Sequence, residues 1–376
     1  MDPAFVPDPS LRAPREPDPR ARLGERTFPR ATAVLRAVES APELRALIST
    51  SSRANMAELA SGFPVAAQTI CYECRLGEGN ERVDLALCLF PGFDSGPGNT
   101  GSVFDSLASR DPAWARCLQF LKRWEAPGSS LWPRIPFTWV AFELDRPRSQ
   151  LPAPCLGLCV ERDFLFRRNG SSESTLLPAS SVEEVAAECC PSLLGEPLPD
   201  TLRRTLSRCD EASVEGVKPK HLSFMYSRSP RSFKLDVELP LDSVSSFLKR
   251  LGWPRSTRAI EAAIRSLMPW EGSVQLNLVL HPELSPVLEV EFLTLPSEAS
   301  SERRFAFAQK LVVTGLAASA KVDALHVLSS RPLVTGPGEF DLARSWYVKV
   351  RFRDELPFEA KAYVGIMPCR PSTHEM

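Results

Sequence analysis

Apolar and polar residues alternate strictly along two runs within residues 346–366. In the first run Tyr347, Lys349 and Arg351 share one face, and apolar or aromatic side chains occupy the other. A period of two residues is typical of a β-strand whose two faces meet different environments. A charged turn around Asp354 joins the two runs, so this stretch is predicted to form a hairpin.

Four further pairs of extended runs precede this hairpin, and stretches of helical composition lie before each pair. The strand pairs are expected at 67–76 and 82–90, 137–144 and 155–160, 221–227 and 232–239, and 274–280 and 287–293. The helices are expected at 31–49 (broken by Pro42) and 53–62, 103–109 and 113–125, 182–189 and 199–208, 241–251 and 256–268, and 303–316 and 320–329. The order helix, helix, strand, strand thus recurs with a period of roughly 65 to 75 residues, which is typical of a fold built from repeated units.

This order predicts an α+β fold in which five ααββ repeats close a ten-stranded antiparallel barrel with the helices outside. A helix pair cannot bury its apolar face alone, and closure of the sheet removes exposed edges. The barrel is expected to form a single domain over residues 31–368, between an N-terminal tail (1–30), expected to be disordered, and a C-terminal tail (369–376). An ordinary two-domain α+β chain, with its strands in separate sheets, is the alternative.

Residue parity predicts which strand face lines the barrel. If the aliphatic faces pack under the helices, as Val83, Leu85, Leu87 and Leu89 would, the opposite residues face the lumen. That lumen set is Glu73, Arg75, Asp84, Trp139, Glu143, His221, Ser223, Met225, Lys234, Asp236, Glu238, Gln275, Asn277, Glu289, Glu291, Tyr347, Lys349, Arg351, Lys361 and Tyr363. Buried charges without water or partners are costly, so the lumen is expected to hold water and a ligand. A solvent-facing sheet would show the same alternation.

Composition narrows the functional classes. The chain has 376 residues, 43% apolar residues and a formal net charge of −1. It therefore lacks the global basic field that nucleic acid or an anionic membrane would attract. We find no apolar run near the ~20 residues of a membrane span, and the N-terminus lacks the apolar core of a secretory signal, so a cytoplasmic location is expected.

The cysteines and histidines indicate no metal site or nucleophilic triad. Cys71 and Cys74 form the one CxxC pair, without a second pair or a histidine cluster at zinc spacing, so structural thiols are expected. No GxSxG motif occurs, and His221 beside Ser223 on one strand is interpreted as a satisfied polar pair.

The repeat order, together with Lys361-Ala362-Tyr363, resembles the aromatic prenyltransferases of the ABBA, or PT-barrel, type. The resemblance covers about residues 31–368. Those enzymes bind an allylic diphosphate with Lys, Arg and Tyr side chains from neighbouring strands, often spaced Lys-x-Tyr. It implies transfer of a prenyl group from a small-molecule prenyl diphosphate to an aromatic, peptide or other nucleophilic natural-product acceptor, with no cofactor, metal or nucleic-acid partner.

The resemblance also implies roles for the lumen residues. Donors for the departing diphosphate are expected at Lys234, Lys349, Arg351 and Lys361. Aromatic faces that stabilise an allylic cation are expected at Tyr347, Tyr363 and Trp139. Candidate bases that accept the proton of the acceptor are Glu73, Glu143 and Glu289.

The charge of the predicted lumen departs from this pattern. Seven acidic residues face five basic residues in the lumen set, and the whole chain contains four tyrosines. A lumen that holds a diphosphate should be more positive. A non-catalytic barrel that binds a peptide or metabolite, as an accessory protein in biosynthesis, is therefore the alternative, and the charge around Lys361 distinguishes the two.

Overall fold

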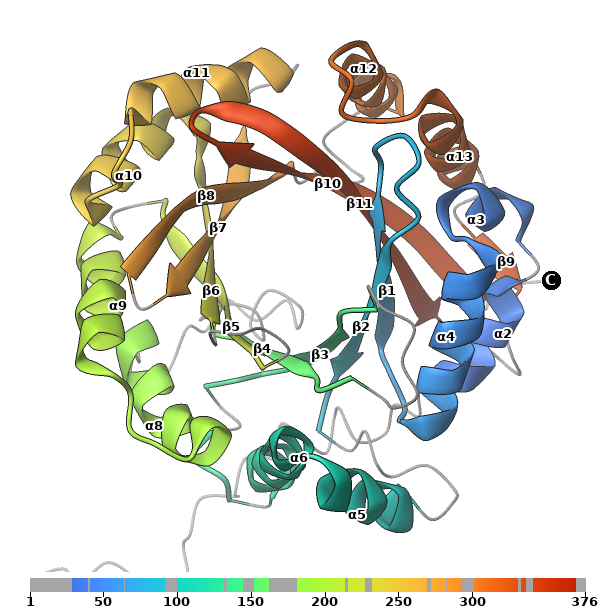
Figure 1. Ribbon diagram of the computed structural model, residues 1–376, viewed down its shortest axis with the longest axis vertical. Helices are drawn as coiled ribbons and strands as arrows, with labels where there is room; N and C mark the ends of the chain where they lie inside the picture. The colour runs from blue at the N-terminus through green and yellow to red at the C-terminus, as the bar shows by residue number, and fades with distance from the viewer. Residues whose placement is uncertain are drawn as a thin grey trace, which may run out of the picture.

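The computed structural model describes residues 29–369, except for 40, 64, 92–99, 127, 132–133, 145–151, 162–180, 214–215, 227–231, 269–271, 282, 293–300, 331–332 and 336–340. The N-terminal tail, up to residue 28, and the C-terminal tail, from residue 370, lie outside the described residues. In the described part, helices form an outer ring around the strands (Figure 1).

The helices follow the expected pairs. They are α2 (Ala31–Glu39), α3 (Pro42–Leu47), α4 (Thr50–Gly62), α5 (Thr100–Arg110), α6 (Pro112–Glu125), α8 (Val182–Leu194), α9 (Asp200–Ala212), α10 (Val244–Leu251) after the 3-10 turn η1 (Leu241–Ser243), α11 (Thr257–Leu267), α12 (Ser301–Val313) and α13 (Ser319–Ser330). Local signals explain several ends: Ser181 and Glu184 form a capping box at the start of α8. Gly252, with φ 82°, ends α10 in the left-handed region.

The strands form one closed antiparallel ring. They are β1 (Thr69–Arg75), β2 (Val83–Leu89), β3 (Thr138–Phe142), β4 (Cys155–Cys159), β5 (Lys218–Met225), β6 (Ser232–Pro240), β7 (Ser273–His281), β8 (Glu283–Phe292), β10 (Asp341–Arg353) and β11 (Leu356–Cys369). Each pairs with the next in this order, β8 pairs with β10, and β11 pairs with both β10 and β1. The predicted ten-stranded barrel is thus confirmed. A short strand that the sequence pattern did not predict, β9 (Leu333–Thr335), pairs with the start of β10.

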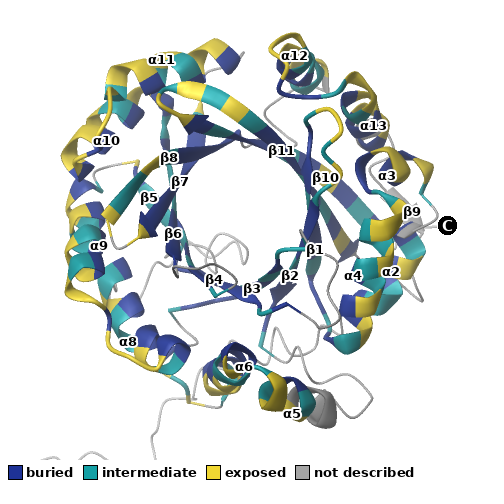
Figure 2. Cartoon of the chain, in the orientation of Figure 1, coloured by how far each residue is buried: buried dark blue, intermediate teal, exposed yellow. Residues whose placement is uncertain are grey.

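Burial confirms the predicted strand faces. Val83, Leu85, Leu87 and Leu89 are at most 1% exposed, and the buried residues in Figure 2 lie on the strands and on the strand-facing sides of the helices. Tyr226, next to Met225 of the predicted lumen set, points outward and donates a hydrogen bond from its hydroxyl to the Leu193 carbonyl of α8 at 2.8 Å. The polar face of the same strands therefore lines the barrel. No helix among the described residues is both long and apolar enough to cross a membrane.

Candidate functional site in the barrel lumen

Three cations lie side by side on three neighbouring strands of the lumen. Lys349 of β10 is opposite Lys361 of β11, and Lys361 is opposite Arg75 of β1. We call these three residues the cation row. Like charges directly opposite each other destabilise a sheet unless anions lie between them, so the row requires compensating negative charge.

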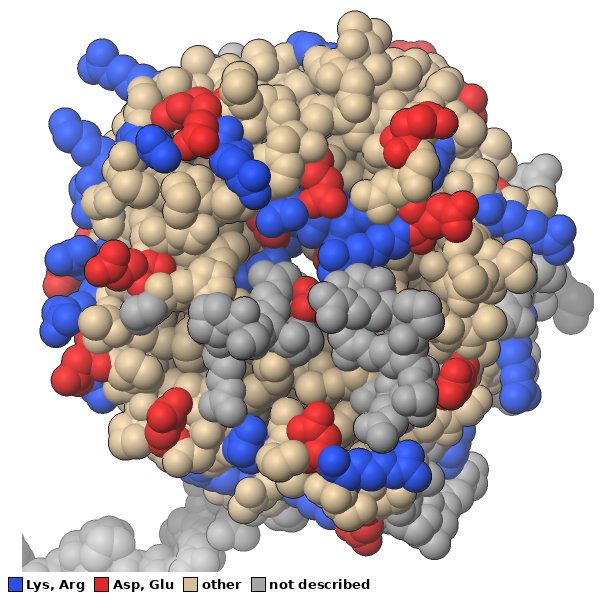
Figure 3. Space-filling view, viewed as in Figure 1, with Lys and Arg blue, Asp and Glu red and all other residues tan. Residues whose placement is uncertain are grey.

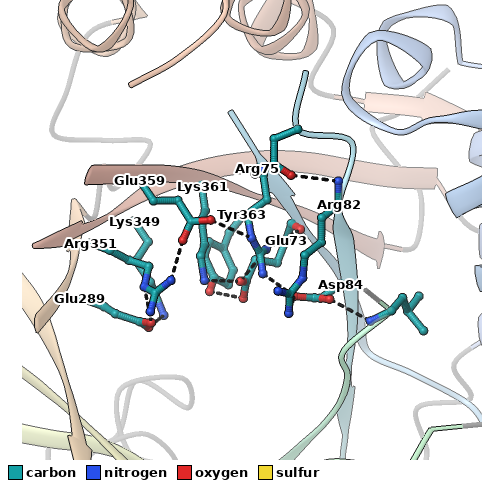
Figure 4. A network of polar contacts seen from close by, with 12 residues as sticks. Glu73, Arg75, Arg82, Asp84, Glu289, Lys349, Arg351, Glu359, Lys361 and Tyr363 are labelled. Carbon is teal, nitrogen blue, oxygen red and sulfur yellow. Dashed lines mark hydrogen bonds and ion pairs between the residues drawn. The ribbon is translucent and has the colours of Figure 1, made fainter. Parts of the chain in front are cut away.

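Carboxylates supply that charge from both sides of the cation row (Figure 4). Glu73 lies 2.7 Å from Lys361 and 2.8 Å from Arg75. Asp84 lies 2.7 Å from Arg75, and Glu291 lies 2.6 Å from Lys349. Each member of the row is therefore neutralised within the protein.

Two further cations extend this network around the barrel. Lys234 of β6 lies 2.8 Å from Glu289. Arg351 lies 3.2 Å from Glu289 and 2.8 Å from Glu359. Glu359 lies two residues before Lys361 and shares its strand face, although it is not in the predicted lumen set. A bulge between Arg351 and Phe352 sets its register against Arg351.

The two tyrosines of the hairpin stack next to the cation row. The rings of Tyr347 and Tyr363 are 4.9 Å apart between centroids and 9° from parallel. Lys349 Nζ lies 4.8 Å from the centroid of Tyr363, and the Tyr363 hydroxyl donates to Glu73. The site thus combines cations, a carboxylate and aromatic faces within one patch.

The charges of this patch stabilise each other. Burial would raise the pKa of Glu73, but Lys361 and Arg75 hold it well below its ordinary value. The same competition, with Lys234 as the main cation, holds the pKa of Glu289 well below its ordinary value. Burial and nearby carboxylates raise the pKa of Tyr347 and Tyr363 well above 10.0, so both remain phenols at neutral pH.

A different wall covers the β2–β4 side of the lumen. Cys88, Phe90, Phe137 and Cys159 form a small buried cluster, and Trp139 packs against it. The Trp139 ring meets that of Phe137 edge-on, with centroids 6.3 Å apart. Trp139 therefore lies on β3, away from the tyrosine pair of β10 and β11.

The structure places most of the sequence-predicted site residues in one network. The contacts given above join Glu73, Glu289, Lys234, Lys349, Arg351, Lys361, Tyr347 and Tyr363. Glu143 directly follows the end of β3, next to Leu144, whose N–H donates to Asp84 at 2.9 Å.

Figure 3 shows the face of the molecule hollowed at its centre, with basic and acidic side chains beside the opening. In the described residues no group of three or more His, Cys, Asp or Glu side chains is arranged to hold a metal ion.

Solved structures share this architecture. The crystal structure of 6-dimethylallyltryptophan synthase from Micromonospora olivasterospora, in complex with DMASPP and Trp, matches with a TM-score of 0.51 and 11% identity, over 89% of this chain and 97% of that one. That of 5-dimethylallyl tryptophan synthase from Streptomyces coelicolor, also with DMASPP and Trp, matches with a TM-score of 0.50 and 15% identity, over 92% and 97%. No family model and no curated protein sequence matches the chain. These similarities confirm the PT-barrel fold that the repeat order predicted.

Proposed function

We propose that this barrel transfers an allylic prenyl group from its diphosphate to an aromatic or other nucleophilic small-molecule acceptor. The observation that carries the proposal is the cation row beside the stacked Tyr347 and Tyr363. The fold similarity to two enzymes crystallised with DMASPP and Trp supports it.

The cation row has the composition that ionisation of an allylic diphosphate requires. Lys349, Lys361 and Arg75 can donate to the oxygens on which negative charge develops as the C–O bond breaks. The diphosphate would take over contacts that Glu73, Asp84 and Glu291 make without a ligand. Burial raises the pKa of Glu291 and of Asp84, so these two carboxylates give up their charge more readily than Glu73.

Stabilisation of the allylic cation and removal of the acceptor proton would use Tyr347, Tyr363 and Glu73. The faces of the two stacked rings can stabilise the allylic cation by cation–π attraction. Glu73, which accepts a hydrogen bond from the Tyr363 hydroxyl, is the preferred base for the acceptor proton. Glu289, which already holds Lys234, Lys349 and Arg351, is better suited to positioning cations.

The test is calorimetric titration with dimethylallyl and geranyl thiolodiphosphate, unreactive analogues of the donor. We expect micromolar binding that weakens at least tenfold, about 1.4 kcal/mol, in Lys361→Ala. The exposed Lys249 of α10 provides the matched control, and Lys249→Ala should bind like the wild type. Absence of binding by the folded wild type, or equal binding by both variants, would reject the proposal.

The ion pairs favour a second candidate, a non-catalytic barrel that binds a cationic peptide. The five cations Arg75, Lys234, Lys349, Arg351 and Lys361 are matched by the five carboxylates Glu73, Asp84, Glu289, Glu291 and Glu359. A guanidinium group could replace a lysine against these carboxylates. Titration with a short arginine-rich peptide tests this alternative: binding that is lost in Glu73→Gln, without binding of either diphosphate analogue, would favour it.

A further inference from the structure

Glu291 of β8 lies beside the cation row and has one cation partner among the described residues. It lies 2.6 Å from Lys349, and Gln275 of β7 donates to its other oxygen from Nε2 at 3.1 Å. The register sets Gln275, Glu291 and Lys349 side by side on three neighbouring strands. Because Glu291 is 4% exposed, bulk water does little to compensate its charge, and the carboxylate depends on Lys349.

The other carboxylates around the cation row each have a further donor outside the row. These pairs are Glu73 with the Tyr363 hydroxyl, Asp84 with the Leu144 N–H, Glu289 with Lys234, and Glu359 with Arg351. A ligand that took over the cations of the row would therefore leave each of these carboxylates with a donor. Of the groups that the structure describes around Glu291, only the neutral amide of Gln275 would remain as its donor.

The lumen network has no positive charge in excess with which to receive an anion. Its five cations are matched by five carboxylates. A diphosphate adds several negative charges, and buried negative charge without compensation is costly. Protonation of one carboxylate removes a negative charge from the protein and so compensates part of the charge that the ligand brings.

The groups around Glu291 decide how readily it takes a proton. Burial raises its pKa, Lys349 opposes the rise, Asp236 of β6 adds to it and His221 of β5 opposes it, with a net upward shift. An anion bound at Lys349 would cancel the main opposing charge, so the pKa of Glu291 would rise further on binding. The other titratable groups that face Glu291 are Glu289 on the same strand face, Tyr347, Tyr363 and Cys71.

Gln275 can satisfy Glu291 in either protonation state. A primary amide carries both a donor and an acceptor. In the charged state Nε2 donates to the carboxylate. After protonation, half a turn of the amide presents its oxygen, which accepts from the new carboxyl O–H. The pair therefore stays hydrogen-bonded in both states, as buried polar groups require.

We propose that the lumen binds an organic diphosphate together with one proton, and that Glu291 takes up this proton. The proton passes from solvent to the Glu291 carboxylate as the diphosphate oxygens contact Lys349, and no covalent bond forms or breaks in the ligand. The neutral acid then leaves the Lys349 ammonium to the ligand, so Glu291 acts as a positioning residue. This inference rests on the proposed function, because it takes the diphosphate as the ligand.

The experiment counts the protons that accompany binding. The full chain is titrated calorimetrically with dimethylallyl thiolodiphosphate at pH 8, in buffers of different ionisation enthalpy. The second pKa of a phosphate is about 6, so the ligand itself takes up few protons at this pH. We expect an uptake of about one proton per bound ligand. Binding with an uptake near zero would overturn the inference and leave prenyl transfer standing, whereas no binding would reject both.

Two variants assign the proton to a residue. Glu291→Gln is neutral and similar in size, so it should bind with an uptake near zero. Its affinity relative to the wild type should grow by up to about tenfold for each pH unit between pH 7 and 9. The matched control is Glu238→Gln, because Glu238 lies opposite Gln275 in the same register row but pairs with Lys220. This control should keep the wild-type uptake.

The outcomes against the assignment are equally clear. Uptake of one proton by Glu291→Gln, or loss of the uptake in both variants, would reject Glu291 as the proton site. If Glu291→Gln does not unfold cooperatively, infrared difference spectroscopy of the wild type decides instead. Addition of the ligand should then produce the C=O band of a protonated carboxyl group, and a difference spectrum without that band would overturn the inference.

Discussion

Glu289 is a buried carboxylate that three cations of the lumen share. It is 1% exposed and lies 2.8 Å from Lys234, 3.2 Å from Arg351 and 3.7 Å from Lys349. Removal of one member of a buried ion pair leaves its partner charged and without compensation, which costs more than the pair contributed. A substitution at Glu289 removes a carboxylate that three cations share, although Lys349 keeps Glu291 and Arg351 keeps Glu359.

We expect Glu289→Gln to lower the free energy of unfolding by about 3–5 kcal/mol at pH 7. The folded-state pKa of Glu289 lies well below 4.5, so its contribution is present above the unfolded pKa and is lost as pH falls through the folded value. The difference between wild type and variant should therefore stay constant from pH 7 to about 4.5 and shrink only in stronger acid. Urea denaturation at several pH values measures it.

The control for this prediction is Glu283→Gln, on the same strand but exposed. Its stability should match that of the wild type, because exposed charges contribute little. A loss of less than about 1 kcal/mol in Glu289→Gln would show that the remaining carboxylates compensate for it.

At the scale of elements, α13 holds the turn of the β1–β2 hairpin through one lysine. Lys321 Nζ donates to the carbonyls of Arg75 at 2.7 Å and Gly77 at 3.3 Å, and to that of Asn80. The N–H of Ala318, the residue before the same helix, donates to the Leu76 carbonyl at 2.8 Å. The outer ring therefore fixes the end of the strand that carries Glu73 and Arg75.

Lys321→Met should lower the free energy of unfolding by about 1.5–3 kcal/mol, the range for hydrogen bonds to a charged group. Methionine retains much of the apolar stem, so the loss reports the ammonium contacts. Thermal and urea unfolding would be compared with Lys310→Met, an exposed lysine of α12. Equal stability of the two variants would mean that water replaces the lysine at these carbonyls.

Alternation within each strand was sufficient to predict the elements and their faces. It could not predict which residues meet across strands, because that depends on register between segments far apart in the chain. Glu73 and Lys361 are 288 positions apart. The pairing of Cys159 with His221 illustrates the same limit, because nothing in the run 155–160 indicates which residue of another strand its last strand residue will be opposite. Bulges, such as the one between Pro219 and His221, shift register in a way that alternation does not reveal.

At the scale of the whole molecule, the pairing of β11 with β1 joins the last strand of the chain to the first. An open sheet would leave those two strands at its edges, where hydrogen bonds break first. In this ring, peptides from β1 and β11 should exchange amide hydrogens as slowly as those from β6 and β7. Native-state hydrogen exchange with mass spectrometry measures this. Early exchange confined to β1 and β11 would show that the ring opens at this seam.

Charge pairing inside the lumen has a consequence for how a ligand arrives. Cations and carboxylates lie within a few ångströms of each other on adjacent strands, so their fields largely cancel beyond the mouth of the barrel. A uniformly basic funnel would draw anions from solution and would do so less effectively in salt. A ligand of this barrel would instead arrive by diffusion without electrostatic steering, and we expect discrimination between ligands to begin only at contact with the lumen wall.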